Sequence, residues 1–244
     1  MRTVLALSGL LATATPALAQ APQGCPVRPD IITANAGLQN ARAAVATGRL
    51  TILAMGSSSI EGVGASQPDL GFVPLLEAAL ERRLPGVAVT VLNKGIGGET
   101  ARDTRLRFDR EISAAQPDLV IWQLGTNDVL RDRDMDDIFA DFRQGQAVLD
   151  EVGVDVLLID PQRLPETTAN PAFKGRNPAL AEMARLIDLE GNRVGYAVQH
   201  RFRAMADWAV LPGGGVGPDD LHLNDAGYAC WAENTAEGLA AALL

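Results

Sequence analysis

The sequence predicts an α/β fold, a three-layer α/β/α sandwich built around a mainly five-stranded parallel sheet. Apolar runs of strand length alternate along the chain with segments whose apolar residues recur at helical spacing. Behind a short leader, the chain has the length of one α/β domain and can bury a sizeable core. Repeated strand and helix units of this kind form a parallel sheet that helices cover on both faces.

The expected strands are short apolar runs at residues 50–55, 87–92, 119–124, 154–159 and 196–199. Segments such as LTILAM and LVIWQL are typical of strands that are buried on both faces of a sheet. The last run is the shortest of the five. Because each run is followed by a helical segment, all five are expected to lie parallel.

The expected helices occupy residues 35–46, 72–84, 101–115, 138–152, 178–190 and 225–241. Pro74 falls in the first turn of the second helix, and Pro85 with Gly86 ends it. Asn224 is expected to cap the last helix. Residues 20–29 are polar and rich in proline, so residues 20–48 are predicted to form a tether and one helix before a main domain at 49–244.

Residues 1–19 have the pattern of a secretory signal peptide. Arg2 gives a positive start, an apolar stretch follows, and Ala17-Leu18-Ala19 is a small-x-small cleavage site. The stretch is too short to span a bilayer, although a retained membrane anchor is the alternative interpretation. We therefore expect a secreted or periplasmic protein without stable membrane insertion.

The charge balance and the absence of two motif types exclude several functions. The formal net charge is −9, and a field of that sign repels phosphate backbones, so nucleic acid is not an expected partner. Thr100 stands where a dinucleotide-binding Gly-x-Gly-x-x-Gly fingerprint needs its third glycine. No cysteine and histidine cluster has metal-ligand spacing. We expect neither a metal nor an organic cofactor.

Cys25 and Cys230 are the only cysteines. In an oxidising compartment they are expected to form a disulfide that ties the two ends of the mature chain together. The alternative is two free thiols, with Cys230 buried as a small apolar residue.

Four short motifs carry the chemistry. They are Gly56-Ser57-Ser58-Ser59, the segment 93–98 (NKGIGG), Gly125-Thr126-Asn127-Asp128 and Asp219-Asp220-Leu221-His222. The first three directly follow strands one to three, and the fourth lies in the loop before the last helix. Ligands of such sheets bind beyond the carboxyl ends of the strands, so the four motifs are predicted to converge on one edge.

A serine hydroxyl becomes a nucleophile when a histidine base and an orienting acid lie within reach. Of the two histidines, His222 has Asp219 three residues before it, which places both side chains on one side of a turn. His200 has no neighbouring acid in the sequence and is interpreted as structural or surface-exposed.

The order of the motifs resembles that of the SGNH hydrolases, the GDSL-type esterases, over residues 50–244. The resemblance implies a flavodoxin-like sheet, an SGNH hydrolase domain at 49–244, and a catalytic set of Ser58, His222 and Asp219. Ser57 stands where the family usually has aspartate, and Ser57 and Ser59 are interpreted as turn and cap hydroxyls. The implied oxyanion hole consists of the backbone N–H groups of Ser58 and Gly98 and the side-chain amide of Asn127.

The expected function is that of an exported serine ester hydrolase that works through an acyl-enzyme. Its expected ligand is a small-molecule or carbohydrate ester, its expected acyl group is short, above all acetyl, and its expected state is a monomer. The edge loops 161–178 and 211–218 hold few large apolar residues that could line a trough for a long acyl chain. An O-acyltransferase, a lysophospholipase or thioesterase, and a non-enzymatic carbohydrate-binding domain are the alternatives. The charged segment 131–137 is interpreted as a solvated loop and helix start, with contact to substrate or calcium as the alternative.

Overall fold

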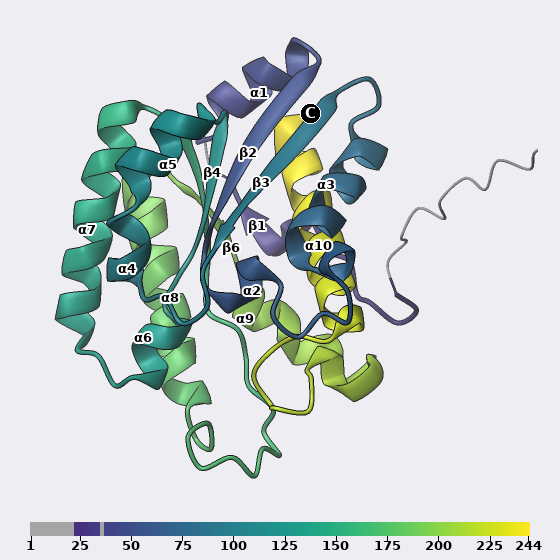
Figure 1. Ribbon diagram of the computed structural model, residues 1–244, viewed down its shortest axis with the longest axis vertical. Coiled ribbons are helices and arrows are strands. Elements are labelled where there is room, and N and C mark those ends of the chain that lie inside the picture. Colours follow the sequence, from purple (N-terminus) through teal and green to yellow (C-terminus); the bar gives the residue numbers. More distant parts are fainter. Residues whose placement is uncertain (1–21, 35–36) are drawn as a thin grey trace, which may run out of the picture.

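The computed structural model describes residues 22–34 and 37–244 and forms three layers (Figure 1). The expected signal peptide at 1–19 and the expected helix start at Asn35 lie outside these residues. The central sheet has six strands in the order β1-β6-β5-β4-β2-β3. The strands are β1 Ile32–Thr33, β2 Arg49–Gly56, β3 Ala88–Gly95, β4 Leu119–Gln123, β5 Asp155–Ile159 and β6 Ala197–Gln199.

The five predicted strands are all present and all parallel. Numbered along the chain, these five lie in the spatial order 2-1-3-4-5, so the flavodoxin-like prediction is confirmed. The sixth strand, β1, pairs antiparallel with β6 at the sheet edge and was not predicted. Two residues are too few to show a strand period in a sequence.

Helices cover both faces of the sheet, as Figure 1 shows. One face packs against α1 Gln39–Ala46, α3 Phe72–Arg83 and α10 Asp225–Leu243, and the other against α4 Ala101–Arg105, α5 Phe108–Ala115, α7 Met135–Val152 and α8 Asn177–Val194. Along β2, Ile52 and Ala54 belong to the first core, whereas Leu53 and Met55 belong to the second. This alternation follows from the period of two of a strand.

Short helices begin where the strands end. The helices α2 Ser58–Glu61, α6 Thr126–Leu130 and α9 Arg201–Ala204 start within three residues of the ends of β2, β4 and β6. Four 3-10 turns complete the fold at Pro29–Ile31, Pro68–Leu70, Met205–Val210 and Pro212–Gly215. The backbone is therefore arranged to present α2 and α6, which carry the first and third motifs, at one edge of the sheet.

The expected helix at 101–115 is broken in two at Leu106 and Arg107, so its prediction as one continuous helix is wrong. At the break the Arg107 guanidinium turns back to donate to the Lys94 carbonyl and to the Glu99 carboxylate. The break also starts α5 at Phe108, which packs edge-on against Trp122 in the core. The spacing of apolar residues in this segment is helical, but the Arg107–Glu99 ion pair and the packing of Phe108 on Trp122 accompany a break between the two helices.

Cys25 and Cys230 form a disulfide, with 5.5 Å between their Cα atoms. It joins the first described residues to α10, which lies between the sheet and solvent. Asn224 caps α10 as predicted, because its side chain accepts a hydrogen bond from the Gly227 N–H at 3.0 Å. Among the described residues, no helix has both the length and the hydrophobicity that a bilayer crossing requires.

Candidate active site

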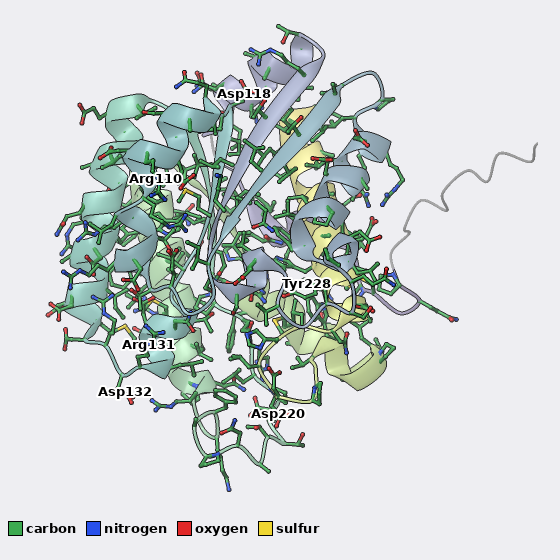
Figure 2. All side chains as sticks on the ribbon, in the orientation of Figure 1. Arg110, Asp118, Arg131, Asp132, Asp220 and Tyr228 are labelled. Carbon is green, nitrogen blue, oxygen red and sulfur yellow. A yellow bond between two sulfur atoms is a disulfide. The ribbon has the colours of Figure 1, made fainter. Side chains whose placement is uncertain are left out.

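The four motifs meet at the carboxyl edge of the sheet. Figure 2 shows Asp118, which directly precedes β4, at the top of the molecule, and Arg131 and Asp220 near its lower end. Strand β4 therefore runs from the top of this view toward the motifs. The lower edge is the place where ligands bind in parallel α/β sheets.

The first motif forms a tight turn between β2 and α2. Gly56 has a φ of 155°, and a Cβ atom there would lie 2.9 Å from Gln123, so only glycine fits. Ser57 and Ser59 are buried, whereas Ser58 is half-buried. Ser57 donates both its N–H and its hydroxyl to Gln123 Oε1, at 3.0 and 2.9 Å. Of the three serines, Ser58 is the one open to a ligand.

The structure brings Ser58 to the fourth motif. Ser58 Oγ lies 3.0 Å from His222 Nε2, and His222 Nδ1 lies 2.5 Å from Asp219 Oδ2. The other Asp219 oxygen accepts the backbone N–H groups of Leu221 and His222, at 3.1 and 2.9 Å. The carboxylate thus fixes both the ring of His222 and the turn that carries it.

Asp219 is held in its charged form. Partial burial opposes ionisation, but hydrogen bonds from the side chain and backbone of His222 hold the pKa of Asp219 below its usual value. An ionised Asp219 favours the tautomer of His222 that carries its proton on Nδ1, which leaves Nε2 free to accept from the Ser58 hydroxyl. The adjacent Asp220 instead accepts a hydrogen bond from Thr168 Oγ1 at 2.7 Å.

The second and third motifs lie beside Ser58. A Cβ atom on Gly97 would stand 4.0 Å from Ser58 Cβ, and Gly98 has a φ of +82°, which favours glycine. Asn127 Nδ2 donates to the carbonyl of Glu99, the residue after Gly98, at 2.9 Å. The amide of Asn127 is therefore tied to the glycine loop, and one of its two N–H groups is committed to that bond.

The charged segment 131–137 mostly serves the fold. Arg133 bridges Asp128 and Asp141 at 2.7 and 2.6 Å, and Asp134 caps α7 by accepting from the Asp136 N–H. Asp132 pairs with Arg176. These contacts favour the interpretation of a loop and helix start, and no group of three or more potential metal ligands occurs in the described part of the chain.

His200 directly follows β6, and its side-chain contacts do not reach the four motifs. Its Nε2 is 2.8 Å from Thr33 Oγ1, on the antiparallel strand β1. Burial lowers the pKa of His200, and the nearest carboxylate, Asp188, is 3.8 Å away. The contact with Thr33 links the end of β6 to β1, which favours the interpretation of His200 as a structural residue.

Two glutamines of the site were not singled out from the sequence. Gln123 ends β4 and binds Ser57, while Gln162 follows β5 and contacts Ser59. Each is a polar residue at or just beyond the end of an apolar run, which is the signal in the sequence that could have found them.

An open cavity of about 380 Å³ lies between the two edge loops and the 3-10 turn Met205–Val210. Its lining includes Arg163, Leu164 and Thr167 from the first loop and Gly213 and Val216 from the second. Val216 also forms a β-bridge with Leu223, the residue after His222. One lining residue of the cavity is therefore paired with the segment that carries His222.

Comparisons with known proteins bear on the family and the fold of the chain. The profile of the non-GDSL lipase-like family matches residues 24–211. An acetylxylan esterase from Geobacillus stearothermophilus is 37% identical over 65 residues, which make up 27% of this chain and 30% of that protein. That match thus spans less than a third of the relative's own length.

Two solved structures resemble the fold. TesA superposes with a TM-score of 0.65 and 24% identity, over 80% of this chain and 99% of its own. A two-domain esterase active on acetylated mannans superposes with a TM-score of 0.63 and 22% identity, over 87% of this chain and 56% of its own. At sequence identities below 25%, these superpositions show a shared fold and nothing more.

Proposed function

Since the chain belongs to the non-GDSL lipase-like family of the SGNH hydrolases, we propose that it is a serine carboxylic ester hydrolase. The observation that carries the proposal is the continuous hydrogen-bonded series from Ser58 through His222 to Asp219. A hydroxyl, an imidazole and a carboxylate in this order are what acyl transfer through a covalent intermediate requires.

In the proposed reaction, His222 Nε2 takes the proton of Ser58 as Oγ attacks the ester carbonyl carbon. Asp219 stabilises the imidazolium that forms, and His222 then returns the proton to the leaving alcohol. Water attacks the resulting acyl-enzyme with help from the same base. The acid leaves, and the Ser58 hydroxyl is restored.

The negative oxygen of the tetrahedral intermediate needs donors that are in place before the reaction. We assign this role to the backbone N–H groups of Ser58 and Gly98 and to Asn127 Nδ2. The close approach of Gly97 to Ser58 and the bond from Asn127 to Glu99 support this set. Fixed donors of this kind act at no reorganisation cost when charge develops.

The proposed substrate is a short acyl ester, above all an acetyl ester, of a carbohydrate or similar polar alcohol. The large apolar residues of the edge loops that could line an acyl trough are Leu164, Leu211 and Val216, which are almost fully buried, and Phe173, which is half-buried. Leu164 and Val216 line the cavity between the loops with only 2% and 8% of their surface exposed. A long acyl chain would lose about 0.8 kcal/mol for each methylene left without an apolar partner. The partial match to an acetylxylan esterase points to the same substrate class.

We place the mature enzyme outside the cytoplasm, in the periplasm or secreted. The disulfide supports this location, because such bonds persist in oxidising compartments. Fractionation of cells that express the full chain tests it. Activity confined to the cytosolic fraction would contradict it.

Hydrolysis of p-nitrophenyl esters from acetate to palmitate, alongside acetylated xylan and mannan, tests the function. We expect kcat/KM to be highest for acetate and to fall as the chain lengthens, and acetate to be released from the polysaccharides. A steady rise in kcat/KM beyond about eight carbons would indicate a lipase or lysophospholipase with an apolar trough. Acetyl transfer to an added sugar at the expense of free acetate would indicate an acyltransferase.

A further inference from the structure

We propose that Gln162 is a positioning residue that holds three catalytic loops in register. The inference rests on the proposed function. Gln162 is buried directly beyond β5 and is not itself in contact with Ser58 or His222 through any of its hydrogen bonds. It acts through the neighbours of the reacting residues.

Each of three hydrogen bonds of Gln162 reaches a residue adjacent to a proposed catalytic group. Its Oε1 accepts from the hydroxyl of Ser59, which follows Ser58, at 3.3 Å. Its backbone N–H donates to the hydroxyl of Thr126, which precedes Asn127, at 3.4 Å. Its Nε2 donates to the carbonyl of Leu221, which precedes His222. One side chain and its own backbone therefore connect the nucleophile, the oxyanion donor and the base.

Arg201 fixes the orientation of the Gln162 amide. Arg201 Nη2 donates to Gln162 Oε1 at 3.0 Å and to Ser59 Oγ at 3.2 Å. A guanidinium only donates, so it can be satisfied by the oxygen of Gln162 and not by its NH2 group. The NH2 group must then face the Leu221 carbonyl.

The Arg201 guanidinium depends strongly on its hydrogen bond to Gln162 Oε1. Arg201 is fully buried, and its guanidinium lies 4.0 Å from the ring centroid of Trp231. Its Nε and Nη1 have no hydrogen-bond partner among the described residues, so the contacts of Nη2 are the polar contacts that its head group makes there. A buried charge with so few partners favours the one arrangement that supplies an acceptor.

Loss of the bond to Leu221 loosens the turn that carries His222. That turn is also held by the two N–H groups that Asp219 accepts, by the Gly217 N–H on the His222 carbonyl and by the Thr168 hydroxyl on Asp220, but none of these bonds reaches the first motif. A shift of about 1 Å between a nucleophile and its base lowers turnover by up to about 100-fold. Because Gln162 is almost fully buried, it offers no surface to a substrate, and substrate binding should be nearly unchanged.

Three variants separate positioning from folding. Gln162→Glu keeps an acceptor for Arg201 and gives that cation a counter-charge, but loses the donor to Leu221. Gln162→Met loses all the side-chain hydrogen bonds at similar volume. Asn234→Leu is the control for the loss of a buried amide, because Asn234 is equally buried and bonds Arg28 and Cys230, outside both the catalytic loops and the Arg201 support.

The experiment measures kcat and KM for p-nitrophenyl acetate and the thermal midpoint of each full-length variant. We expect Gln162→Glu to lower kcat by about 10- to 100-fold with KM within about threefold, while its midpoint equals or exceeds that of the wild type. Gln162→Met should lose kcat similarly and also lose stability. Asn234→Leu should lose stability but keep kcat within about threefold of the wild type.

Wild-type kcat in Gln162→Glu would overturn the assignment while leaving the esterase proposal intact. An equal loss of kcat in Gln162→Met and Asn234→Leu would also overturn it, because the loss would then follow from general destabilisation. If Gln162→Glu does not fold, the comparison of Gln162→Met with Asn234→Leu decides. An inert wild-type protein would instead overturn the proposed function, and the assignment with it.

Discussion

The disulfide offers a prediction whose magnitude follows from its place in the chain. Cys25 and Cys230 are 205 residues apart, so the bridge closes nearly the whole described chain into one loop. In the chain-entropy description, a loop of that length lowers the entropy of the unfolded state by an amount worth about 5 kcal/mol at 25 °C. Cys25→Ser is the cleaner perturbation, because Cys230 is fully buried and its substitution would also disturb packing.

For a domain of this size, 1 kcal/mol corresponds to roughly 2–4 °C in Tm, so we expect Cys25→Ser to melt about 10–20 °C lower. Circular dichroism melts with and without a thiol reductant measure this. Reductant should lower the Tm of the wild type toward that of the variant and leave the variant unchanged. Two titratable thiols in the oxidised, denatured wild type, or equal Tm values for the two proteins, would refute the reasoning.

Three further predictions concern the site and the core beneath it. Ser58→Ala and His222→Ala should each lower kcat for p-nitrophenyl acetate by about 10⁴-fold or more, while His200→Ala keeps most of it, since His200 bonds only the sheet edge. Asn127→Ala should lower kcat by about 100- to 1000-fold, the loss of about 3 kcal/mol of oxyanion stabilisation, with little change in KM. Burial raises the pKa of Asp160 from 3.8 to about 8. Between pH 3.8 and about pH 8 the folded protein therefore keeps a proton on Asp160 that the unfolded chain has lost. Its free energy of unfolding should fall as the pH rises through that window. Urea unfolding at several pH values should show a flatter dependence for Asp160→Asn, and an equally steep one would contradict the assignment.

The strands and motifs could be predicted because their patterns are local. Each of the runs that became β2 to β6 is apolar and short, and the motif residues occur directly beyond three of them. Parallel strands bring their carboxyl ends to one edge, so the gathering of the first three motifs follows from topology, whereas His222 reaches Ser58 from the loop before α10. The catalytic roles of these residues stay predictions until activity is measured.

The remaining features depend on contacts between distant segments. The strand β1 forms because Ile32 and Thr33 pair with β6. The expected helix is broken at Arg107, where the guanidinium binds the Glu99 carboxylate. The network of Gln162 and Arg201 joins residues 39 positions apart in the chain. No period or propensity of a single segment encodes such a partner.

The measurement that tests the central claim most directly is labelling of the protein with a fluorophosphonate probe, followed by mass-spectrometric mapping of the modified peptide. The probe reacts only with a serine that a neighbouring base activates. We predict one modification, on Ser58, and its loss in Ser58→Ala and in His222→Ala. A label on Ser57 or Ser59, or undiminished labelling of the Ser58→Ala variant, would contradict the assignment of the nucleophile, and no labelling of the wild type would contradict the proposed serine chemistry itself.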